Sequence, residues 1–192
     1  MKITGHTKIV GIFGDPVEQT LSPAMHNAAF EALGVEMAYV PFHVRSMDLG
    51  AAVDGIRALN MRGMNITIPH KEEVLKHLDG IDGHARGVGA VNSIVNMDGS
   101  LIGYNTDGPG YLLSLRDDAG CAPGGKKIII IGAGGAARSI AYAFLGARPA
   151  AVTLANRTES RAVDLAVEFR GKFSGVDINT APLEKEALRP LM

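Results

Sequence analysis

An apolar run passes directly into a glycine-rich turn at residues 127–138. The run Lys127–Ile131 predicts a buried strand, and Gly132, Gly134 and Ala137 follow it in the spacing G-x-G-x-x-A. The first glycine allows a tight bend, and the second lets a pyrophosphate approach the backbone. The third small residue packs the following helix against the strand. The pattern therefore predicts a dinucleotide-binding turn within a βαβ unit.

The helix expected after this turn opens with Gly135 and Ala136. The first N–H groups of a helix have no partner within it, and the helix dipole is positive at that end. Both properties favour a bound phosphate. We therefore assign the backbone of these two residues to the cofactor site as well.

The next strand, expected at 150–155, ends in a group that indicates which dinucleotide binds. NAD sites tend to carry an acidic residue there for the ribose hydroxyls, whereas this chain carries Asn156, Arg157 and Thr158, with Arg161 one helical turn later. Two guanidinium groups and no acid suit the 2′-phosphate of NADP. In the alternative interpretation, Thr158 only caps a helix and the arginines are solvated. We predict NADP as the cofactor and these four residues as part of its site.

The composition describes an ordinary globular chain. It has 192 residues, 46% of them hydrophobic, and a net charge of −1, which gives no electrostatic argument for a nucleic-acid or membrane partner. Cys121 is the one cysteine, so no disulfide can form within the chain, and no apolar run follows the first residues as in a signal peptide. We expect a cytoplasmic protein that acts on a small molecule as a monomer or homodimer.

Predicted strands and helices alternate along the chain. Strands are expected at 8–14, 37–44, 63–68, 90–96, 100–105, 127–131, 150–155 and 175–180. Helices are expected at 22–33, 46–60, after Pro69, at 107–118, 135–146 and 158–170, with Ser22 and Ser46 as N-caps. A turn-rich stretch at 119–125 predicts two domains, 1–120 and 121–192. The fold class is therefore α/β, with an N-terminal α/β substrate-binding domain followed by an incomplete Rossmann-type domain for NADP.

Short polar groups fall at strand ends or in loops of the first segment. They lie at residues 20–22, 65–71, 90–93 and 105–108. Such loops are where α/β sheets place ligands, and these hydroxyls and amides suit a hydroxyl-rich ring. Lys71 and Asp107 would form a proton-relay pair if they meet in space. Each residue also has a purely structural interpretation, with Ser22 and Asp107 as helix caps and Lys71 as an exposed lysine. No Cys/His cluster has metal-ligand spacing, so no metal site is predicted.

Taken together, these motifs resemble the shikimate dehydrogenase family. The resemblance extends from about residue 8 to 180 and rests on residues 22–27, 65–71, 89–92, 105–108, 132–138 and 156–158. It implies NADPH-dependent reduction of 3-dehydroshikimate to shikimate, a step in aromatic amino-acid biosynthesis. It assigns Lys71 and Asp107 as the catalytic pair. It assigns to the substrate site Thr20, Ser22, Asn65, Thr67 and Asn92.

Three departures from the family pattern accompany this resemblance. The family often has Ser where this chain has Thr20, so the hydroxyl that binds the substrate carboxylate is retained. The family often has Phe where this chain has His70, so His70 is not expected to be catalytic. The family also continues beyond residue 192, so we expect that the C-terminal part is lacking. Two alternatives stay open, a quinate/shikimate dehydrogenase that uses NAD and a truncated, non-catalytic fragment that binds substrate.

Overall fold

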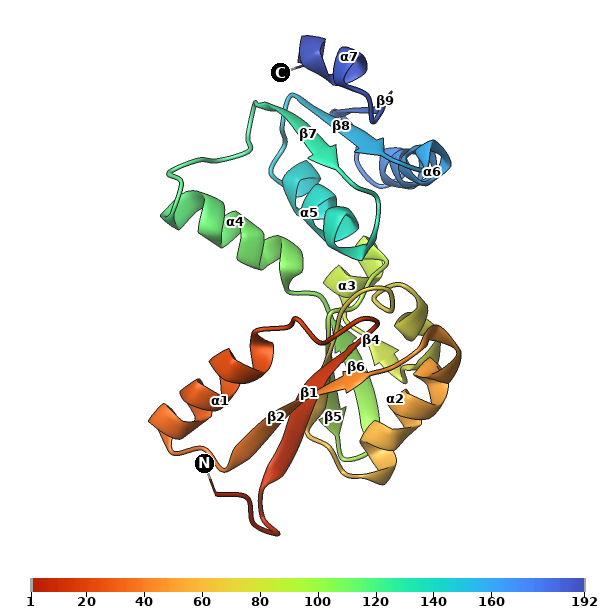
Figure 1. Cartoon of the computed structure of the whole chain (residues 1–192). Helices are drawn as coiled ribbons and strands as arrows, with labels where there is room; N and C mark the ends of the chain where they lie inside the picture. The colour runs from red at the N-terminus through yellow and green to blue at the C-terminus, as the bar shows by residue number, and fades with distance from the viewer. Residues whose placement is uncertain (1, 192) are drawn as a thin grey trace. The chain divides into compact units, whose positions relative to one another are not determined.

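The computed structural model describes residues 2–191 and divides into two compact units, Met1–Asn105 and Thr106–Met192. The α/β fold class predicted from the sequence is confirmed (Figure 1). The sequence places the division at residue 120, whereas the helix Asp107–Asp117 packs with the second unit. The assignment of substrate and cofactor domains to 1–120 and 121–192 stays a prediction.

The first unit is a six-stranded mixed sheet in the order β2-β1-β3-β5-β6-β4. Its elements are β1 (Lys8–Gly14), α1 (Ser22–Leu33), β2 (Met37–His43), η1 (Ser46–Asp48), α2 (Leu49–Ala58), β3 (Gly63–Ile66), η2 (Glu73–His77), β4 (Gly80–Ile81), α3 (Gly83–Val88), β5 (Ser93–Met97) and β6 (Ser100–Tyr104). Strand β1 pairs in parallel with β2 and β3, and β5 pairs antiparallel with β3 and β6. Asp98 and Gly99 connect β5 to β6 in a hairpin, with positive φ angles of 51° and 95°.

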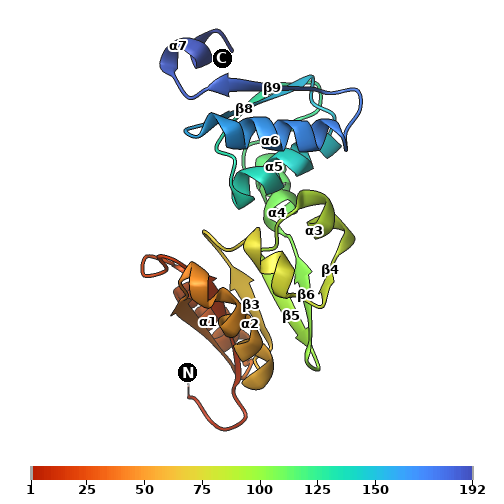
Figure 2. The same cartoon turned by 90° about the vertical axis from the view of Figure 1, so that its right-hand side faces the viewer.

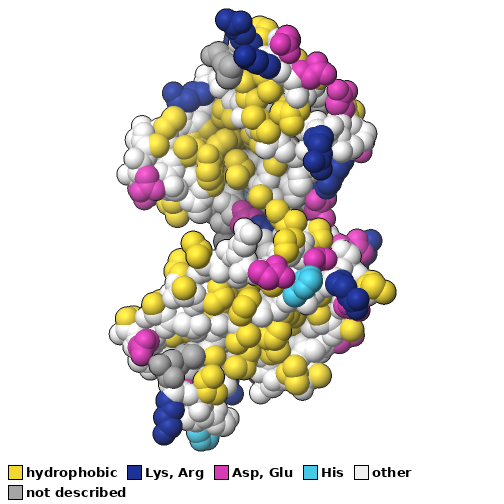
Figure 3. Space-filling view, viewed as in Figure 1, with side chains coloured by type: hydrophobic (Ala, Val, Ile, Leu, Met, Phe, Trp, Pro, Cys, Tyr) yellow, Lys and Arg dark blue, Asp and Glu magenta, His cyan; other side chains and the backbone are white. Residues whose placement is uncertain are grey.

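The two faces of this sheet are packed very differently. Helix α2 buries Leu49, Val53 and Ile56 in a large apolar cluster on one face. Helix α1 lies on the other side of β1–β3 (Figure 1) and buries none of its residues fully. Its Phe30 packs on a small cluster that contains Tyr39. The face covered by α1 is therefore the less closed of the two, and apolar side chains are visible at the surface of this unit (Figure 3).

The second unit is a three-stranded parallel sheet in the order β7-β8-β9. Its elements are α4 (Asp107–Asp117), β7 (Lys127–Ile131), α5 (Gly135–Gly146), β8 (Ala151–Asn156), α6 (Glu159–Arg170), β9 (Asp177–Pro182), α7 (Lys185–Leu188) and η3 (Arg189–Leu191). Figure 2 shows α6 along β8 and β9, and residues of α5 and α6 share one core with the strands. The predicted bounds of β7 and α5 are confirmed residue for residue.

Glycine is required where α4 approaches α5. A Cβ atom at Gly108 would lie 2.5 Å from the carbonyl oxygen of Ser139 and 2.8 Å from Cβ of Ala143. Real Cβ contacts are essentially never that short, so only glycine permits this approach. Gly108, in the first turn of α4, thus allows this helix to lie close against α5.

Three local predictions are wrong. Ser22 and Ser46 are the first residues of α1 and of a 3₁₀ turn, and neither helix has a side-chain cap hydrogen bond. The helix predicted after Pro69 is a turn followed by a short 3₁₀ helix. The carbonyl oxygen of Lys71 accepts a hydrogen bond from the Val91 N–H at 2.8 Å, a residue outside this segment, instead of the N–H of a following helical turn.

Within residues 2–191, no helix has the length and apolar character that a membrane crossing requires.

Candidate functional site

Three of the predicted substrate residues line one hollow of the first unit. This hollow of about 530 Å³ lies beyond the carboxyl ends of β1 and β3, and Thr20, Ser22 and Thr67 contribute to its wall. All three side chains are partly buried. The backbone N–H of Thr67 donates to the Phe13 carbonyl oxygen at 2.9 Å, which holds this residue against the end of β1. Three residues that carry hydroxyl groups thus line one space at the carboxyl ends of parallel strands, a common ligand position in α/β proteins.

The other two predicted substrate residues, Asn65 and Asn92, are connected through Ser93. The Asn65 amide donates to the Ser93 hydroxyl at 3.0 Å and to the Asn92 carbonyl oxygen at 3.3 Å. The Ser93 hydroxyl in turn donates to the Asn92 side-chain oxygen at 3.1 Å. Strand pairing brings these residues together, since Asn65 of β3 lies opposite Ser93 of β5.

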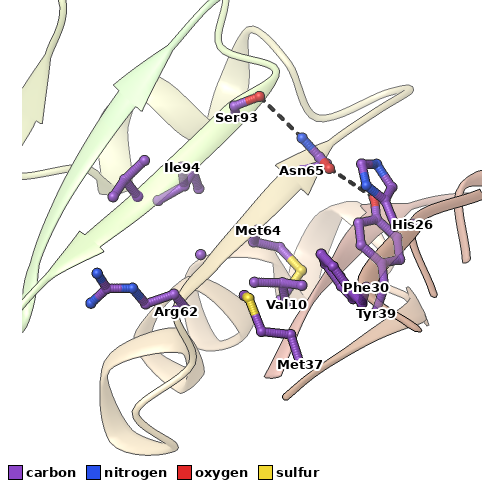
Figure 4. Close-up of a pocket in the computed structure, with 13 residues that line it drawn as sticks. Val10, His26, Phe30, Met37, Tyr39, Arg62, Met64, Asn65, Ser93 and Ile94 are labelled. Atoms are coloured by element: carbon purple, nitrogen blue, oxygen red, sulfur yellow. Dashed lines mark hydrogen bonds between the residues drawn. The ribbon is translucent and has the colours of Figure 1, made fainter. Parts of the chain in front are cut away.

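Asn65 and Ser93 also line a second hollow of about 300 Å³ in the same unit (Figure 4). Tyr39 of β2 faces Asn65 there, and its hydroxyl donates to the Asn65 side-chain oxygen at 2.8 Å. Sequence reasoning missed Tyr39 because it lies in an apolar strand without any motif around it. It also missed the role of Ser93, although this residue directly follows Asn92 in the sequence.

Lys71 and His70 follow Thr67 in the turn that leads to η2. Lys71 is partly buried, and its position in the first unit is fixed by the backbone bond to Val91. His70 is 1% exposed, and its Nε2 atom donates to the Val44 carbonyl oxygen at 2.6 Å. The buried His70 ring thus joins the turn after β3 to Val44, which directly follows β2. Asp107 is the first residue of α4, which the contacts place in the second unit, so its pairing with Lys71 stays a prediction.

The glycine turn of the second unit has the backbone geometry that the sequence predicts. Gly132 has φ +122°, a conformation that L side chains rarely adopt, and its N–H donates to the Ala155 carbonyl oxygen at 2.7 Å. Gly134 is extended, precedes the first residue of α5, and has open space where a Cβ atom would lie. No side chain caps α5. The turn therefore leaves room for a pyrophosphate at the N-terminus of a twelve-residue helix.

Arg138, the last residue of the glycine motif, has a structural role. Its Nη1 atom lies 2.7 Å from Oε2 of Glu168, and its guanidinium lies 5.8 Å from the centre of the Phe169 ring. Burial would raise the pKa of Glu168, but the hydrogen bonds from Lys172 and Arg138 outweigh it and hold the pKa below its usual value. Arg138 therefore fastens α5 to α6.

The group after β8 combines one fixed amide with two exposed cations. The Asn156 side chain donates to the Thr158 carbonyl oxygen at 2.8 Å, which shapes the loop before α6. Arg157 and Arg161 are exposed. Thr158 precedes the first residue of α6 without a side-chain cap bond. This loop thus offers cations and no carboxylate at the position that distinguishes NADP from NAD.

Two family models match the chain. The model described as shikimate dehydrogenase substrate binding domain matches residues 12–94, and the model described as shikimate / quinate 5-dehydrogenase matches residues 120–185. These matches confirm the resemblance expected from the motifs.

Curated relatives and solved structures extend the similarity over most of the chain. A protein from Geobacter metallireducens named shikimate dehydrogenase (NADP(+)) is 46% identical over 184 residues, which are 96% of this chain and 64% of the relative. A crystal structure of shikimate dehydrogenase with NADP⁺ has a TM-score of 0.86 at 42% identity, over 93% of this chain and 63% of that one. A shikimate 5-dehydrogenase from Listeria monocytogenes, in complex with shikimate and NAD, has a TM-score of 0.86 at 37% identity, over 96% and 64%. The chain thus spans under two thirds of the length of these proteins.

Proposed function

The chain belongs to the shikimate dehydrogenase family, and we propose on this premise that it reduces 3-dehydroshikimate to shikimate with NADPH. The observation that carries the proposal is the hollow at the strand ends, where Thr20, Ser22 and Thr67 meet. Hydroxyl groups donate and accept hydrogen bonds, as a ring that bears hydroxyls and a carboxylate requires.

In this proposal the first unit binds the substrate through side chains. Thr20 and Ser22 donate to its carboxylate, and Thr67 and Asn92 bind its hydroxyls. Asn65 shapes the pocket, because both of its N–H groups already donate within the protein. Fixed side chains of this kind orient a substrate before reaction and lower the entropic cost of reaching the transition state.

Lys71 and Asp107 are the proposed catalytic pair. When bound, NADPH would supply a hydride to the ketone carbon of the substrate. The ammonium group of Lys71 donates a proton to the ketone oxygen as that oxygen gains negative charge. The Asp107 carboxylate is proposed to act with Lys71 in this proton relay.

The second unit is the proposed NADP site. Gly132 and Gly134 keep the backbone accessible to the pyrophosphate, and Ala137 is small enough to lie close to the turn. The N–H groups of Gly135 and Ala136 are at the start of α5. The adenosine end of the site is formed by Asn156, Arg157, Thr158 and Arg161. The two arginines are proposed to pair with the 2′-phosphate.

We further propose that the protein acts in the cytoplasm, as a monomer or homodimer. Support for the location comes from Cys121 as the one cysteine, since a reducing compartment makes no demand for disulfides.

The proposal is tested by following NADPH absorbance with 3-dehydroshikimate. We expect turnover that depends on both compounds, and weaker binding of NAD⁺ than of NADP⁺ in a calorimetric titration. Preferential reduction of NAD⁺ during oxidation of quinate would favour the NAD-dependent alternative. Shikimate binding without turnover would favour the non-catalytic alternative, and the absence of both would contradict the proposal.

A further inference from the structure

Two residues of α1 hold one tyrosine of β2. The Asn27 side chain accepts from the Tyr39 N–H at 2.8 Å and donates to the Tyr39 carbonyl oxygen at 3.0 Å. The His26 ring stacks on the Tyr39 ring, with centroids 4.4 Å apart and planes inclined by 10° (Figure 4). The motif Ser-Pro-x-x-His-Asn at residues 22–27 therefore contributes more than Ser22, because its last two residues fix the backbone and the ring of Tyr39.

The Tyr39 hydroxyl binds one predicted substrate residue. Tyr39 is 4% exposed, and its hydroxyl donates to the Asn65 side-chain oxygen at 2.8 Å. Burial raises the pKa of Tyr39. The phenol is thus protonated at neutral pH and remains a donor to Asn65. One buried hydroxyl of β2 therefore holds the side-chain oxygen of Asn65 in β3.

Two bonds fix which way the Asn65 amide points: Tyr39 donates to its oxygen, and the Asn92 backbone carbonyl accepts from its NH₂ group. An amide has an acceptor end and a donor end, and the network around it decides between two orientations. Tyr39 donates, so the Asn65 oxygen faces β2 and its NH₂ group faces β5. The NH₂ group then donates to Ser93, whose hydroxyl donates to the side-chain oxygen of Asn92. The orientation set at Tyr39 is passed along to Asn92.

We propose that Tyr39 is a positioning residue for substrate recognition, which holds the Asn65 amide and, through Ser93, the Asn92 amide in their binding orientations. Tyr39 acts through these amides, because it lines the hollow that contains Asn65. It does not line the hollow that contains Thr20, Ser22 and Thr67. The inference rests on the proposed function, since the ligand is taken to be shikimate or its ketone.

The test is the Tyr39→Phe variant, which removes only the hydroxyl and keeps the ring against His26. We expect it to bind shikimate about three- to tenfold more weakly in a calorimetric titration, the effect of one hydrogen bond. Binding of NADP⁺ should not change. Val53→Ala is the matched control, because Val53 is fully buried in the core on the α2 side of the sheet. It should lower the melting temperature and leave shikimate affinity unchanged. Equal shikimate affinity of Tyr39→Phe and the unaltered chain would overturn the inference.

A double-mutant cycle separates positioning from a general structural role. If Tyr39 acts through Asn65, Tyr39→Phe should cost clearly less affinity in the Asn65→Ala background than in the unaltered chain. Two effects that simply multiply would overturn the role through Asn65.

The side-chain amide NMR signals of Asn65 provide a readout without ligand. They should shift in Tyr39→Phe and stay in place in Val53→Ala. If the unaltered chain does not bind shikimate, the proposed function fails, and these signals alone decide whether Tyr39 orients Asn65. Unshifted signals would then overturn the inference as well.

Discussion

The two units prepare for their ligands by different means. The first unit presents side chains, with hydroxyls at Thr20, Ser22 and Thr67 and amides at Asn65 and Asn92. The second unit presents mainly backbone, in a glycine turn before an uncapped helix. Side chains recognise the shape and hydroxyl pattern of one compound, whereas backbone N–H groups bind the phosphates that all dinucleotides share. In the proposed function, specificity for the substrate would therefore depend on the first unit.

The two arrangements also differ in how far apart their parts lie in the sequence. The bond between Tyr39 and Asn65 joins residues 26 positions apart. The glycine turn, by contrast, is contained in residues 132–137. A single side-chain change in the first unit should therefore affect several binding groups, while the second unit should respond mainly to changes of the turn itself.

The largest effect is expected from Lys71→Ala in the first unit. Loss of the proton donor should lower the turnover of 3-dehydroshikimate by about 10²- to 10⁴-fold, measured by NADPH absorbance. Lys76→Ala is the control, because Lys76 is 70% exposed and pairs with Glu73 at 2.8 Å in the following 3₁₀ helix. It should keep normal turnover. A loss below about tenfold for Lys71→Ala would contradict its role as proton donor.

A smaller effect is expected from Gly134→Ala in the second unit. The backbone there is extended and the Cβ position is open, so the variant should fold with an unchanged melting temperature. The added methyl group would occupy the approach of the pyrophosphate, and NADP⁺ should bind about tenfold or more weakly in a calorimetric titration.

Gly146→Ala is the matched control for this change. A Cβ atom at the end of α5 also meets open space, and the site lies at the opposite end of the helix. NADP⁺ affinity should not change. If Gly134→Ala binds NADP⁺ as well as Gly146→Ala does, the turn is not the pyrophosphate site.

The smallest effect is expected from Glu168→Gln, on the stability of the second unit. The folded state lowers the pKa of Glu168, so its carboxylate stabilises the fold above its ordinary pKa of about 4.3, and this contribution disappears as the pH falls through the folded pKa. Because the pair is partly exposed, solvent screening limits the difference to at most about 1 kcal/mol.

Urea unfolding at pH 7 and pH 3 measures this difference. Glu168→Gln should be less stable than the unaltered chain at pH 7, and the gap should narrow at pH 3. Glu186→Gln, at an exposed position of α7, should show no such gap. A gap that is the same at both pH values would show that the charge of Glu168 is not responsible.

The sequence predicts the second unit better than the first, for a physical reason. An apolar strand, a glycine turn and an amphipathic helix are local signals, and β7 and α5 have the predicted bounds. The short elements β4 and α3 were not predicted, since two strand residues and six helical residues carry too little periodicity. The cap assigned to Ser22 was wrong because α1 begins at Ser22 itself, so that Leu21 occupies the cap position.

The candidate site was predictable where motifs mark it and hidden where only the fold assembles it. The family resemblance assigned Thr20, Ser22 and Thr67, which lie in short polar groups, to the substrate site, and they line one hollow. Tyr39 carries no local signal, because its partners Asn27 and Asn65 lie 12 and 26 positions away. Long-range partners of a strand residue are determined by register, which a single sequence does not display.

A crossed calorimetric titration tests the division of labour between the units. Shikimate and NADP⁺ are each titrated into the unaltered chain, Thr67→Val and Gly134→Ala. Thr67→Val should weaken shikimate about tenfold and leave NADP⁺ within about twofold, and Gly134→Ala should do the reverse. If either variant weakens both ligands equally, or if neither ligand responds to its variant, substrate and cofactor are not bound by separate units in the way described.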